Sequence, residues 1–256
     1  MKLTVLGSGT PSWHFDKATS CYLLDSGSSK IMLDCGSGAM KRCRESGVDI
    51  FDIDVVVLSH TEHPDHSVDF PSLLFALNYK YTPLGRTKRE KQLLVFGPRG
   101  TQRYYQGLLQ LYPLITPQDY ELRIEDCDYQ DLLFGNTRVI ITRVFHGDTP
   151  AVGCRVEQGN STFAYSGDTG WCDELIELFS GVDLGLVECS LPDGFQVMNN
   201  HLNAREVGQL ANTAGVRKLL ITHQYPIGDL SQVEPQIREN YEGEIVFVRD
   251  HDVYVV

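Results

Sequence analysis

Short apolar runs separated by turn residues are followed by segments of helical periodicity, and this order occurs twice along the chain. Runs rich in Val, Ile and Leu between turn residues are typical of strands. Segments with apolar residues three and four positions apart are typical of helices that bury one face. Two rounds of strands followed by helices predict two mixed sheets packed face to face, with helices outside. We therefore predict an α+β fold, a four-layer αββα sandwich.

The predicted elements cover most of the chain, and the stretch 121–165 is rich in strands. Strands are expected at residues 3–6, 21–24, 31–35, 54–59, 93–96, 138–145, 153–157, 162–165, 184–187, 218–222, 245–248 and 253–256. Helices are expected at residues 39–45, 69–79, 101–111, 172–179, 204–213 and 233–241. A chain of 256 residues with 42% hydrophobic residues can bury one large core. We expect a single domain over residues 1–256.

Charge and cysteine content restrict the classes of function. Lys and Arg number 22 and Asp and Glu number 34, so the net charge is −12. Such a surface repels nucleic-acid backbones at long range, so a nucleic-acid partner is not favoured over a small-molecule or phosphodiester substrate. The seven cysteines are scattered without a CxxC pair, which indicates reduced thiols. No signal peptide or membrane-spanning run is visible, so we expect a cytoplasmic protein without a membrane partner.

One basic segment, KYTPLGRTKREK at residues 80–91, opposes the overall charge. It carries five basic residues against one acidic residue, and it contains Pro83 and Gly85. These two residues favour a loop. Two interpretations stay open: a solvated charged loop, or a loop that holds a phosphate-bearing substrate.

Three of the eight histidines fall within seven residues, in the segment His60-Thr61-Glu62-His63-Pro64-Asp65-His66. Imidazole and carboxylate are the common protein ligands of zinc and similar metals. The segment follows directly on the predicted strand DVVVLS at residues 54–59. A ligand at a strand end is rigidly positioned, and the loop beyond it can surround an ion. The segment therefore predicts a metal site.

Three more polar residues stand just past the ends of predicted strands. His146 follows the run 138–145, Asp168 follows the run 162–165, and His223 follows the run 218–222. If these strand ends meet at one edge of the sandwich, their side chains meet there too. Asp168 alone would be interpreted as a turn residue beside Gly167, but its placement matches that of the histidines.

These segments together resemble the metallo-β-lactamase superfamily, over nearly the whole chain. The family is marked by His-x-His-x-Asp-His after a strand, then a distant His, an Asp and a final His. The segments Gly7-Ser8-Gly9-Thr10-Pro11 and Leu33-Asp34-Cys35-Gly36 resemble its opening motifs. The segments Ser166-Gly167-Asp168-Thr169 and Leu220-Ile221-Thr222-His223 resemble its later motifs. The resemblance implies a hydrolase that uses a hydroxide activated by two divalent metals, with zinc expected and manganese or iron as alternatives.

The resemblance also implies a ligand set. It assigns one metal to His60, His63 and His146, the other to Asp65, His66 and His223, and a bridging role to Asp168. Asp65 would also orient the attacking water or accept its proton. One departure concerns the first motif, because two residues, Thr61 and Glu62, separate His60 from His63 where the family has one. The intact His63-Pro64-Asp65-His66 favours counting back from His66, with a local bulge for the extra residue, so His60 is the least secure ligand.

His201, in Asn199-Asn200-His201-Leu202, resembles the histidine loop of the phosphodiesterase branch that includes the transfer-RNA 3′-end endonucleases (tRNase Z). The resemblance implies that His201 helps the leaving oxygen with Glu188 as its partner. The alternative is a polar loop residue before a helix. Only 21 residues separate His146 from Asp168, which leaves no room for the long tRNA-gripping arm of tRNase Z. A homodimer is expected by analogy with the family alone.

We therefore predict a metal-dependent hydrolase acting on a phosphodiester-type substrate. Two alternatives remain, since one centre of this kind serves several chemistries. The first is a hydrolase of carboxylic, thio- or sulfate esters. The second, from another functional class, is a catalytically weak metal-bound protein that binds or senses a ligand.

Overall fold

The computed structural model describes residues 1–12, 16–79, 85, 89–195 and 199–256. Within these residues, fourteen strands form two seven-stranded sheets. In order across the first sheet, the strands are β14 (Val253–Val255), β1 (Lys2–Gly7), β2 (Cys21–Asp25), β3 (Lys30–Leu33), β4 (Val55–Val57), β5 (Leu93–Gly97) and β6 (Leu122–Asp126). In order across the second, they are β13 (Glu244–Phe247), β12 (Lys218–Thr222), β11 (Leu184–Glu188), β10 (Ser161–Tyr165), β9 (Thr149–Gln158), β8 (Thr137–His146) and β7 (Tyr129–Phe134).

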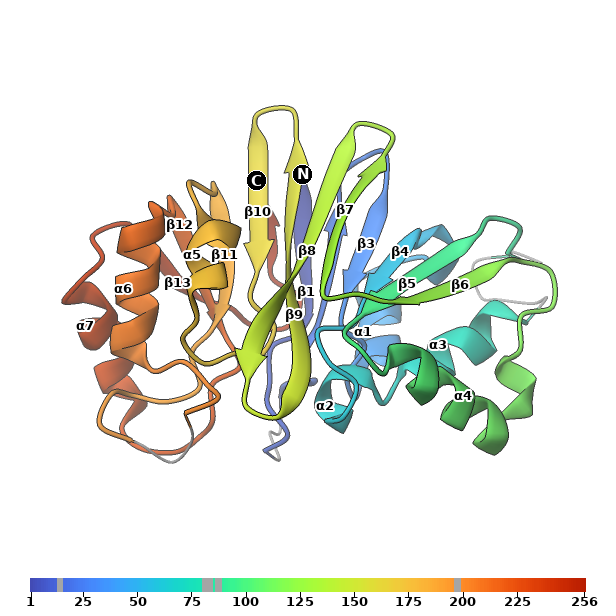
Figure 1. The fold of residues 1–256 in the computed structure, drawn as a ribbon, viewed down its shortest axis with the longest axis horizontal. Coiled ribbons are helices and arrows are strands. Elements are labelled where there is room, and N and C mark those ends of the chain that lie inside the picture. Colours follow the sequence, from blue (N-terminus) through green and yellow to red (C-terminus); the bar gives the residue numbers. More distant parts are fainter. Residues whose placement is uncertain (13–15, 80–84, 86–88, 196–198) are drawn as a thin grey trace.

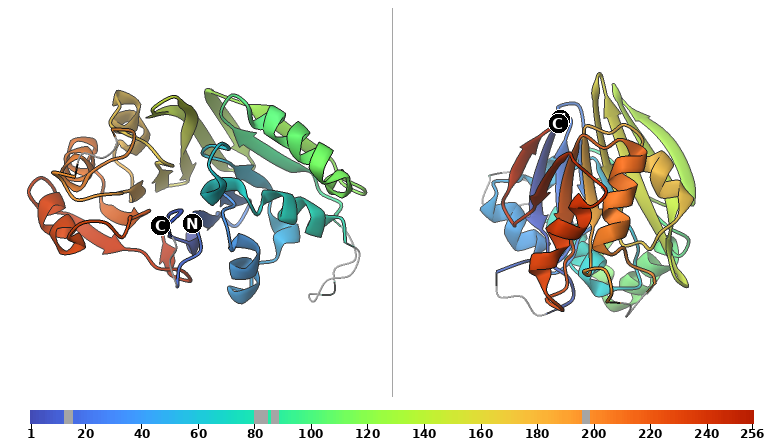
Figure 2. Two further views of the ribbon diagram at one scale, coloured as in Figure 1. Left: turned by 90° about the horizontal axis from the view of Figure 1, so that it is seen from below. Right: turned by 90° about the vertical axis from the view of Figure 1, so that its left-hand side faces the viewer.

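Both sheets are mixed. The pairs from β3 to β6 are parallel, as are those from β10 to β13, and the remaining pairs are antiparallel. The helices are α1 (Ala39–Glu45), α2 (Pro64–Ser67), α3 (Phe70–Leu77), α4 (Thr101–Leu111), α5 (Asp173–Phe179), α6 (Ala204–Ala214) and α7 (Val233–Arg238), with short 3-10 helices at Ile50–Asp52, Pro113–Ile115 and Leu230–Gln232. Helices lie outside the two sheets (Figure 1; Figure 2, left).

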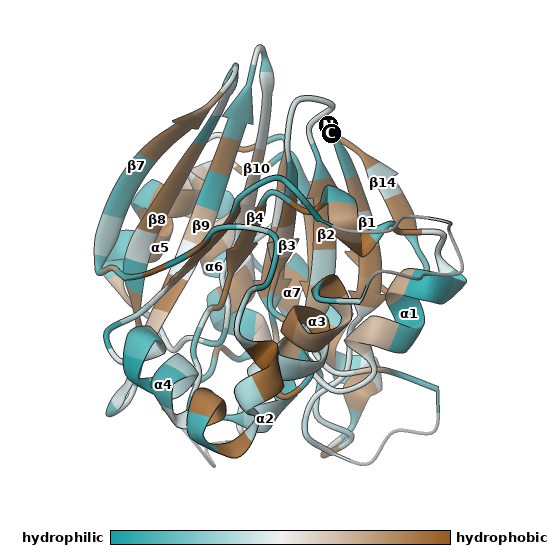
Figure 3. Ribbon diagram, turned by 90° about the vertical axis from the view of Figure 1, so that its right-hand side faces the viewer, coloured by the Kyte–Doolittle hydropathy of each residue, from teal (hydrophilic) through white to brown (hydrophobic). Residues whose placement is uncertain are grey.

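Alternation along the strands produces three apolar layers. On β4, Val55 and Val57 face the other sheet, whereas Val56 packs under the helices of its own sheet. On β12, Leu220 joins the central layer and Leu219 joins the layer beneath α5, α6 and α7. Successive side chains of a strand point to opposite faces, so both faces of each sheet are covered. Figure 3 shows that α3, which packs on the first sheet, is largely hydrophobic. The predicted αββα sandwich is confirmed.

The structure differs from the predicted elements mainly at their ends. The strand expected at 31–35 stops at Leu33, because Asp34 takes a left-handed backbone conformation with φ of 58°. The helix expected at 233–241 ends at Arg238. The four-residue helix α2 was not predicted, since so short an element has no periodicity to detect. The seven cysteines are free thiols, and no helix in the described part of the chain is long and apolar enough to cross a membrane.

Much of the basic segment at residues 80–91 lies outside the described residues, but its end corrects the sequence analysis. Arg89 is only 1% exposed, so it belongs neither to a solvated loop nor to a phosphate-binding one. Its guanidinium donates to the carbonyl oxygens of Phe51, Ile53 and Gln92 at 2.6–2.9 Å. It also lies over the ring of Tyr120, 5.6 Å from the centroid. Arg89 therefore ties together the chain segments that precede β4 and β5.

Replacing Arg89 by Leu should lower the free energy of unfolding by about 3 kcal/mol or more, because three carbonyl oxygens lose their donor. Urea denaturation followed by circular dichroism measures the change. Arg217→Leu is the control, since the Arg217 side chain is 76% exposed and pairs with Asp183 at the surface; its effect should be much smaller. Equal losses in the two variants would contradict the structural role of Arg89.

Candidate metal centre

The predicted ligands converge on one edge of the sandwich, near α2 at the lower edge of Figure 1. His60 follows β4 and His146 ends β8. Asp168 and His223 follow β10 and β12, which run parallel on either side of β11. The carboxyl ends of parallel strands lie at the same edge of a sheet, so the chain folds these side chains together. They form two groups that share this edge.

The first group is His60, His63 and His146. The Nε2 atom of His60 lies 3.1 Å from Nδ1 of His63, and Nε2 of His146 lies 3.5 Å from that same Nδ1. The other nitrogen of His146 bonds to the carbonyl oxygen of Asn200 at 2.9 Å, which directs its Nε2 toward the group. Three ring nitrogens therefore face a common point.

The extra residue between His60 and His63 does not remove His60 from the group. His60 is fully buried, and its ring centroid lies 5.1 Å from that of His146. The chain bends at Thr61, Glu62 and His63 before α2 begins at Pro64. The additional residue is thus accommodated in this loop and not by a bulge within a strand.

The second group is Asp65, His66, Asp168 and His223. The Nε2 atom of His223 lies 3.3 Å from a carboxylate oxygen of Asp65 and 3.5 Å from Nε2 of His66. The Oδ1 atom of Asp168 lies 3.3 Å from Nε2 of His66 and 3.5 Å from Nδ1 of His223. All four side chains are buried.

Both groups fit divalent ions. With zinc–nitrogen bonds of about 2.0–2.1 Å, tetrahedral ligand atoms lie about 3.3 Å apart, close to the spacings within each group. A second indication is Asp168 Oδ1, which is buried and has no hydrogen-bond partner among the described residues. A buried carboxylate oxygen without a partner is costly, and a cation would satisfy it.

The electrostatics agree with this fit. Burial, followed by the neighbouring His66, lowers the pKa of His60 well below its usual value, and burial also lowers the pKa of His146. Both imidazoles are therefore held neutral, the form that binds metal. Burial would raise the pKa of Asp168, but His223 and His66 hold it well below its usual value. Burial opposes the charged form of His66, yet Asp168 and Asp34 raise its pKa well above the ordinary value. Positive charge is thus strongly stabilised between these carboxylates.

Asp34 orients His66, a role that the sequence analysis did not assign. Its carboxylate bonds to Nδ1 of His66 at 2.7 Å, which leaves Nε2 for the cluster. It also accepts bonds from the backbone N–H and hydroxyl of Ser59 and from the hydroxyl of Tyr165, at 2.6–2.8 Å. Asp34 stands just past the end of β3, so the strand-end pattern that revealed Asp168 could have revealed it. Asp34 and His223 both have positive φ values, 58° and 55°, and such strained backbone is concentrated at functional sites.

His201 lies beside both groups and forms the predicted pair with Glu188. Its Nδ1 is 2.8 Å from Oε1 of Glu188, and its ring centroid is 4.9 Å from that of His146. Glu188 is itself held by the backbone N–H of Thr169 and by the hydroxyl of Ser190. Burial would lower the pKa of His201, but Glu188 raises it to about 9. Glu188 thus engages Nδ1 of His201, and Nε2 is the other nitrogen of this ring.

Tyr225 is a further residue at this edge that the sequence analysis missed. Its ring stands edge-on to His223 and His201, with centroids 5.6 and 5.9 Å apart. It is half-buried, so part of its ring is covered and part is exposed to solvent. Its position two residues after His223 was the available signal.

A family model described as "Beta-lactamase superfamily domain" matches residues 29–224. Among curated relatives, the probable metallo-hydrolase YhfI of Bacillus subtilis is 29% identical over 248 residues, which cover 96% of each chain. Ribonuclease Z of Mycobacterium bovis (strain BCG / Pasteur 1173P2) is 26% identical over 255 residues, covering 88% of this chain and 86% of the relative.

Solved structures share the fold. The crystal structure of YhfI matches with a TM-score of 0.82 at 26% identity, covering 99% of this chain and 98% of that chain. The short form of human tRNase Z matches with a TM-score of 0.81 at 19% identity, covering 100% and 99%. The second match shows likeness of fold.

Replacing Asp34 by Asn should weaken zinc binding by about 10- to 100-fold, because His66 loses the carboxylate that orients it. Competition with a chromogenic chelator measures the affinity. Asp54→Asn is the matched control: Asp54 precedes β4, at the end of that strand away from His60, and bonds to Lys30 and Lys91. Unchanged affinity in the Asp34 variant would contradict its orienting role.

Proposed function

Because this chain belongs to the beta-lactamase superfamily, we propose that it is a metal-dependent hydrolase whose substrate is a phosphodiester. The observation that carries the proposal is Asp168. Asp168 belongs to the second of the two residue groups at this edge, and its buried Oδ1 atom lies against His66 and His223. This oxygen lacks a hydrogen-bond partner among the described residues. A centre for two cations explains both groups together.

We assign the ligands as follows: one divalent ion to His60, His63 and His146, a second to Asp65, His66 and His223, with Asp168 shared between them. Zinc fits the imidazole-rich first group, and manganese or iron are the alternatives. When bound, two such ions supply Lewis acidity to a water nucleophile and to the substrate oxygens.

The chain itself supplies proton transfer. His201 is placed to donate a proton from Nε2 to the departing oxygen, since Nδ1 is held by Glu188. Thr169 and Ser190 hold the Glu188 carboxylate in turn, so the ring has one preferred orientation. Asp65, in the first turn of α2, would orient the attacking water or accept its proton. Proton donors positioned in this way typically contribute factors of 10²–10⁴.

The phosphodiester class is supported by the His201–Glu188 pair and by relatives that are named as ribonucleases. Transfer RNA is a less suitable substrate for this chain. The segment between His146 and Asp168 consists of β9 and β10 joined by a short turn, without an inserted arm. The net charge of −12 also opposes long-range attraction of RNA.

The purified protein should hold two divalent ions per chain and should hydrolyse bis(p-nitrophenyl) phosphate. Chelation should abolish turnover, and added zinc or manganese should restore it, because the nucleophile depends on the ions. Metal analysis and release of p-nitrophenolate measure both properties.

Other outcomes would decide between the alternatives. Turnover of thioesters or aryl sulfates alone would favour the ester hydrolase, and one ion or none without turnover would favour a ligand-binding or sensor protein. A His223→Ala variant with full metal content and full activity would contradict the ligand assignment.

Replacing His201 by Ala should lower kcat by about 10²–10⁴-fold for a phosphodiester with an alkyl leaving group, because an alkoxide needs a proton to depart. The loss should be much smaller for bis(p-nitrophenyl) phosphate, whose leaving group departs as a stable anion. Phosphorus NMR follows the first reaction and absorbance the second, with metal content measured alongside. Equal losses on both substrates would argue against proton donation by His201.

A further inference from the structure

A groove of about 370 Å³ begins at the loop that carries the additional residue of the first metal motif. Thr61 and Glu62, which lie between the predicted ligands His60 and His63, form one wall. The other wall is a face of α4 that runs from Arg103 to Leu111. The groove therefore starts beside the candidate metal centre and follows the helix away from it.

Gly107 keeps the middle of this groove open. It lies within α4, and a Cβ atom built on it would meet no heavy atom within 4 Å. Glycine in a helix interior is less stable than alanine, and no close packing requires it here. The absence of a side chain at Gly107 leaves free space along the groove.

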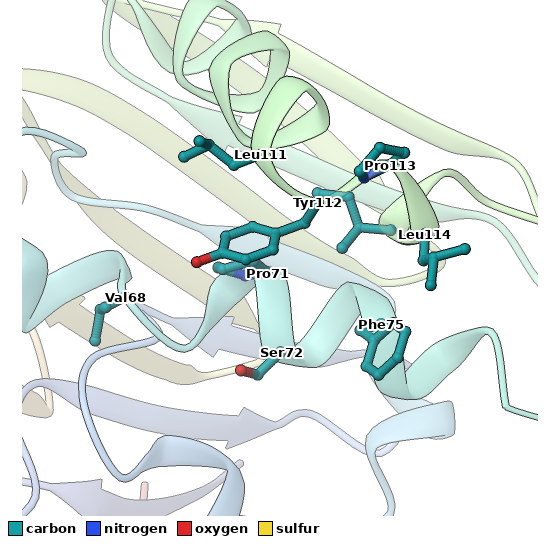
Figure 4. Close-up of a pocket in the computed structure, with 9 residues that line it drawn as sticks. Val68, Pro71, Ser72, Phe75, Leu111, Tyr112, Pro113 and Leu114 are labelled. Carbon is teal, nitrogen blue, oxygen red and sulfur yellow. The ribbon is translucent and has the colours of Figure 1, made fainter.

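A second groove of about 460 Å³ continues from the end of α4, with Leu111 lining both. Figure 4 shows Val68, Pro71 and Phe75 on one side and Leu111, Tyr112 and Leu114 on the other. We call this second groove the apolar trough. Leu111 is 71% exposed and Leu114 is 67% exposed. Gathered exposed apolar side chains mark binding surfaces.

Two contacts fix this path relative to the metal centre. The hydroxyl of Tyr104 on α4 donates to the carbonyl oxygen of Ser67, the last residue of α2, at 2.9 Å. Gly97, just before α4, approaches the strand that leads to His60, because a Cβ there would lie 3.1 Å from the carbonyl oxygen of Leu58. The start of α4 thus lies next to the ligands, and its end lies at the trough.

The lining changes from polar to apolar along this path. Thr61, Glu62 and Arg103 line the first groove, whereas Leu108 and Leu111 lead along α4 into the trough. The polar part of the lining carries one acidic and one basic side chain, Glu62 and Arg103. The eleven residues of α4 span about 16 Å, long enough for an extended hydrocarbon chain.

We propose that the two grooves form one channel for the non-reacting part of the substrate, and that the substrate is an amphiphilic phosphodiester with an alkyl or aryl group. The proposal rests on the phosphodiesterase activity proposed above. The phosphate lies at the metal ligands, and the apolar group extends along α4 past Gly107 into the trough. Burial of that group provides the affinity.

The test compares two substrates with the same scissile bond, p-nitrophenyl methyl phosphate and p-nitrophenyl octyl phosphate, the latter below its micelle concentration. We expect kcat/KM to favour the octyl ester by at least about tenfold, mainly through a lower KM. Failure to hydrolyse either ester would contradict the proposed function. Hydrolysis of both with equal kcat/KM would leave that function intact and overturn the channel.

Three variants test whether the preference for the octyl ester arises in the two grooves. The double variant Leu111→Gln/Leu114→Gln and the single variant Gly107→Leu should each reduce the octyl-to-methyl ratio toward one, by removing apolar contacts and by blocking the path. Leu133→Gln is the matched control, since Leu133 is 72% exposed on β7 and should keep the full ratio.

Sedimentation of the same proteins tests the competing occupant, a second copy of the chain. Suppose that the parent protein is a dimer with an octyl-to-methyl ratio near one, and that the Leu111→Gln/Leu114→Gln variant is a monomer. The trough is then a contact between two copies of the chain, and the proposal is wrong. An octyl preference that survives both groove variants would also overturn it.

Discussion

The mutual proximity of buried imidazole nitrogens and carboxylate oxygens is the constraint on which this structure depends. Ring nitrogens of His60, His63 and His146 lie 3.1–3.5 Å apart, and the Asp168 carboxylate is buried against His66 and His223. Burying so many polar and charged groups together is costly unless their charges are balanced. The fold must therefore hold these groups together against their own preference for water. It does so by placing His60, His146, Asp168 and His223 at or just past strand ends.

The two-sheet architecture makes this possible. One sheet contributes the end of β4 and the other contributes the ends of β8, β10 and β12. The central apolar layer fixes the separation of the sheets, and the two outer layers cover the outer face of each sheet. The ligand edge is consequently a property of the whole sandwich, because ligands from both sheets must meet across it.

Sequence reasoning recovered the layers and the convergence of the ligands because both follow from periodicity and from where polar residues stop an apolar run. It placed α1 and α4 at their observed bounds. It failed for Arg89, since local composition cannot show that a cation in a basic segment turns inward to three carbonyl oxygens. It did not assign Asp34, although this residue stands at a strand end; its contacts with His66 and with Tyr165 in the other sheet are visible only in the folded chain. The grooves along α4 are formed by segments far apart in the sequence, and the sequence analysis did not predict them.

Asp34 joins His66 to Tyr165, and the Tyr165 ring is part of the apolar layer between the sheets. Under the proposed ligand assignment, ion binding at His66 and packing between the sheets are linked through Asp34. Any ion that binds the folded chain alone shifts the folding equilibrium in proportion to the logarithm of its free concentration. With the ligands assigned above, the stability of the sandwich would therefore rise with the free metal concentration.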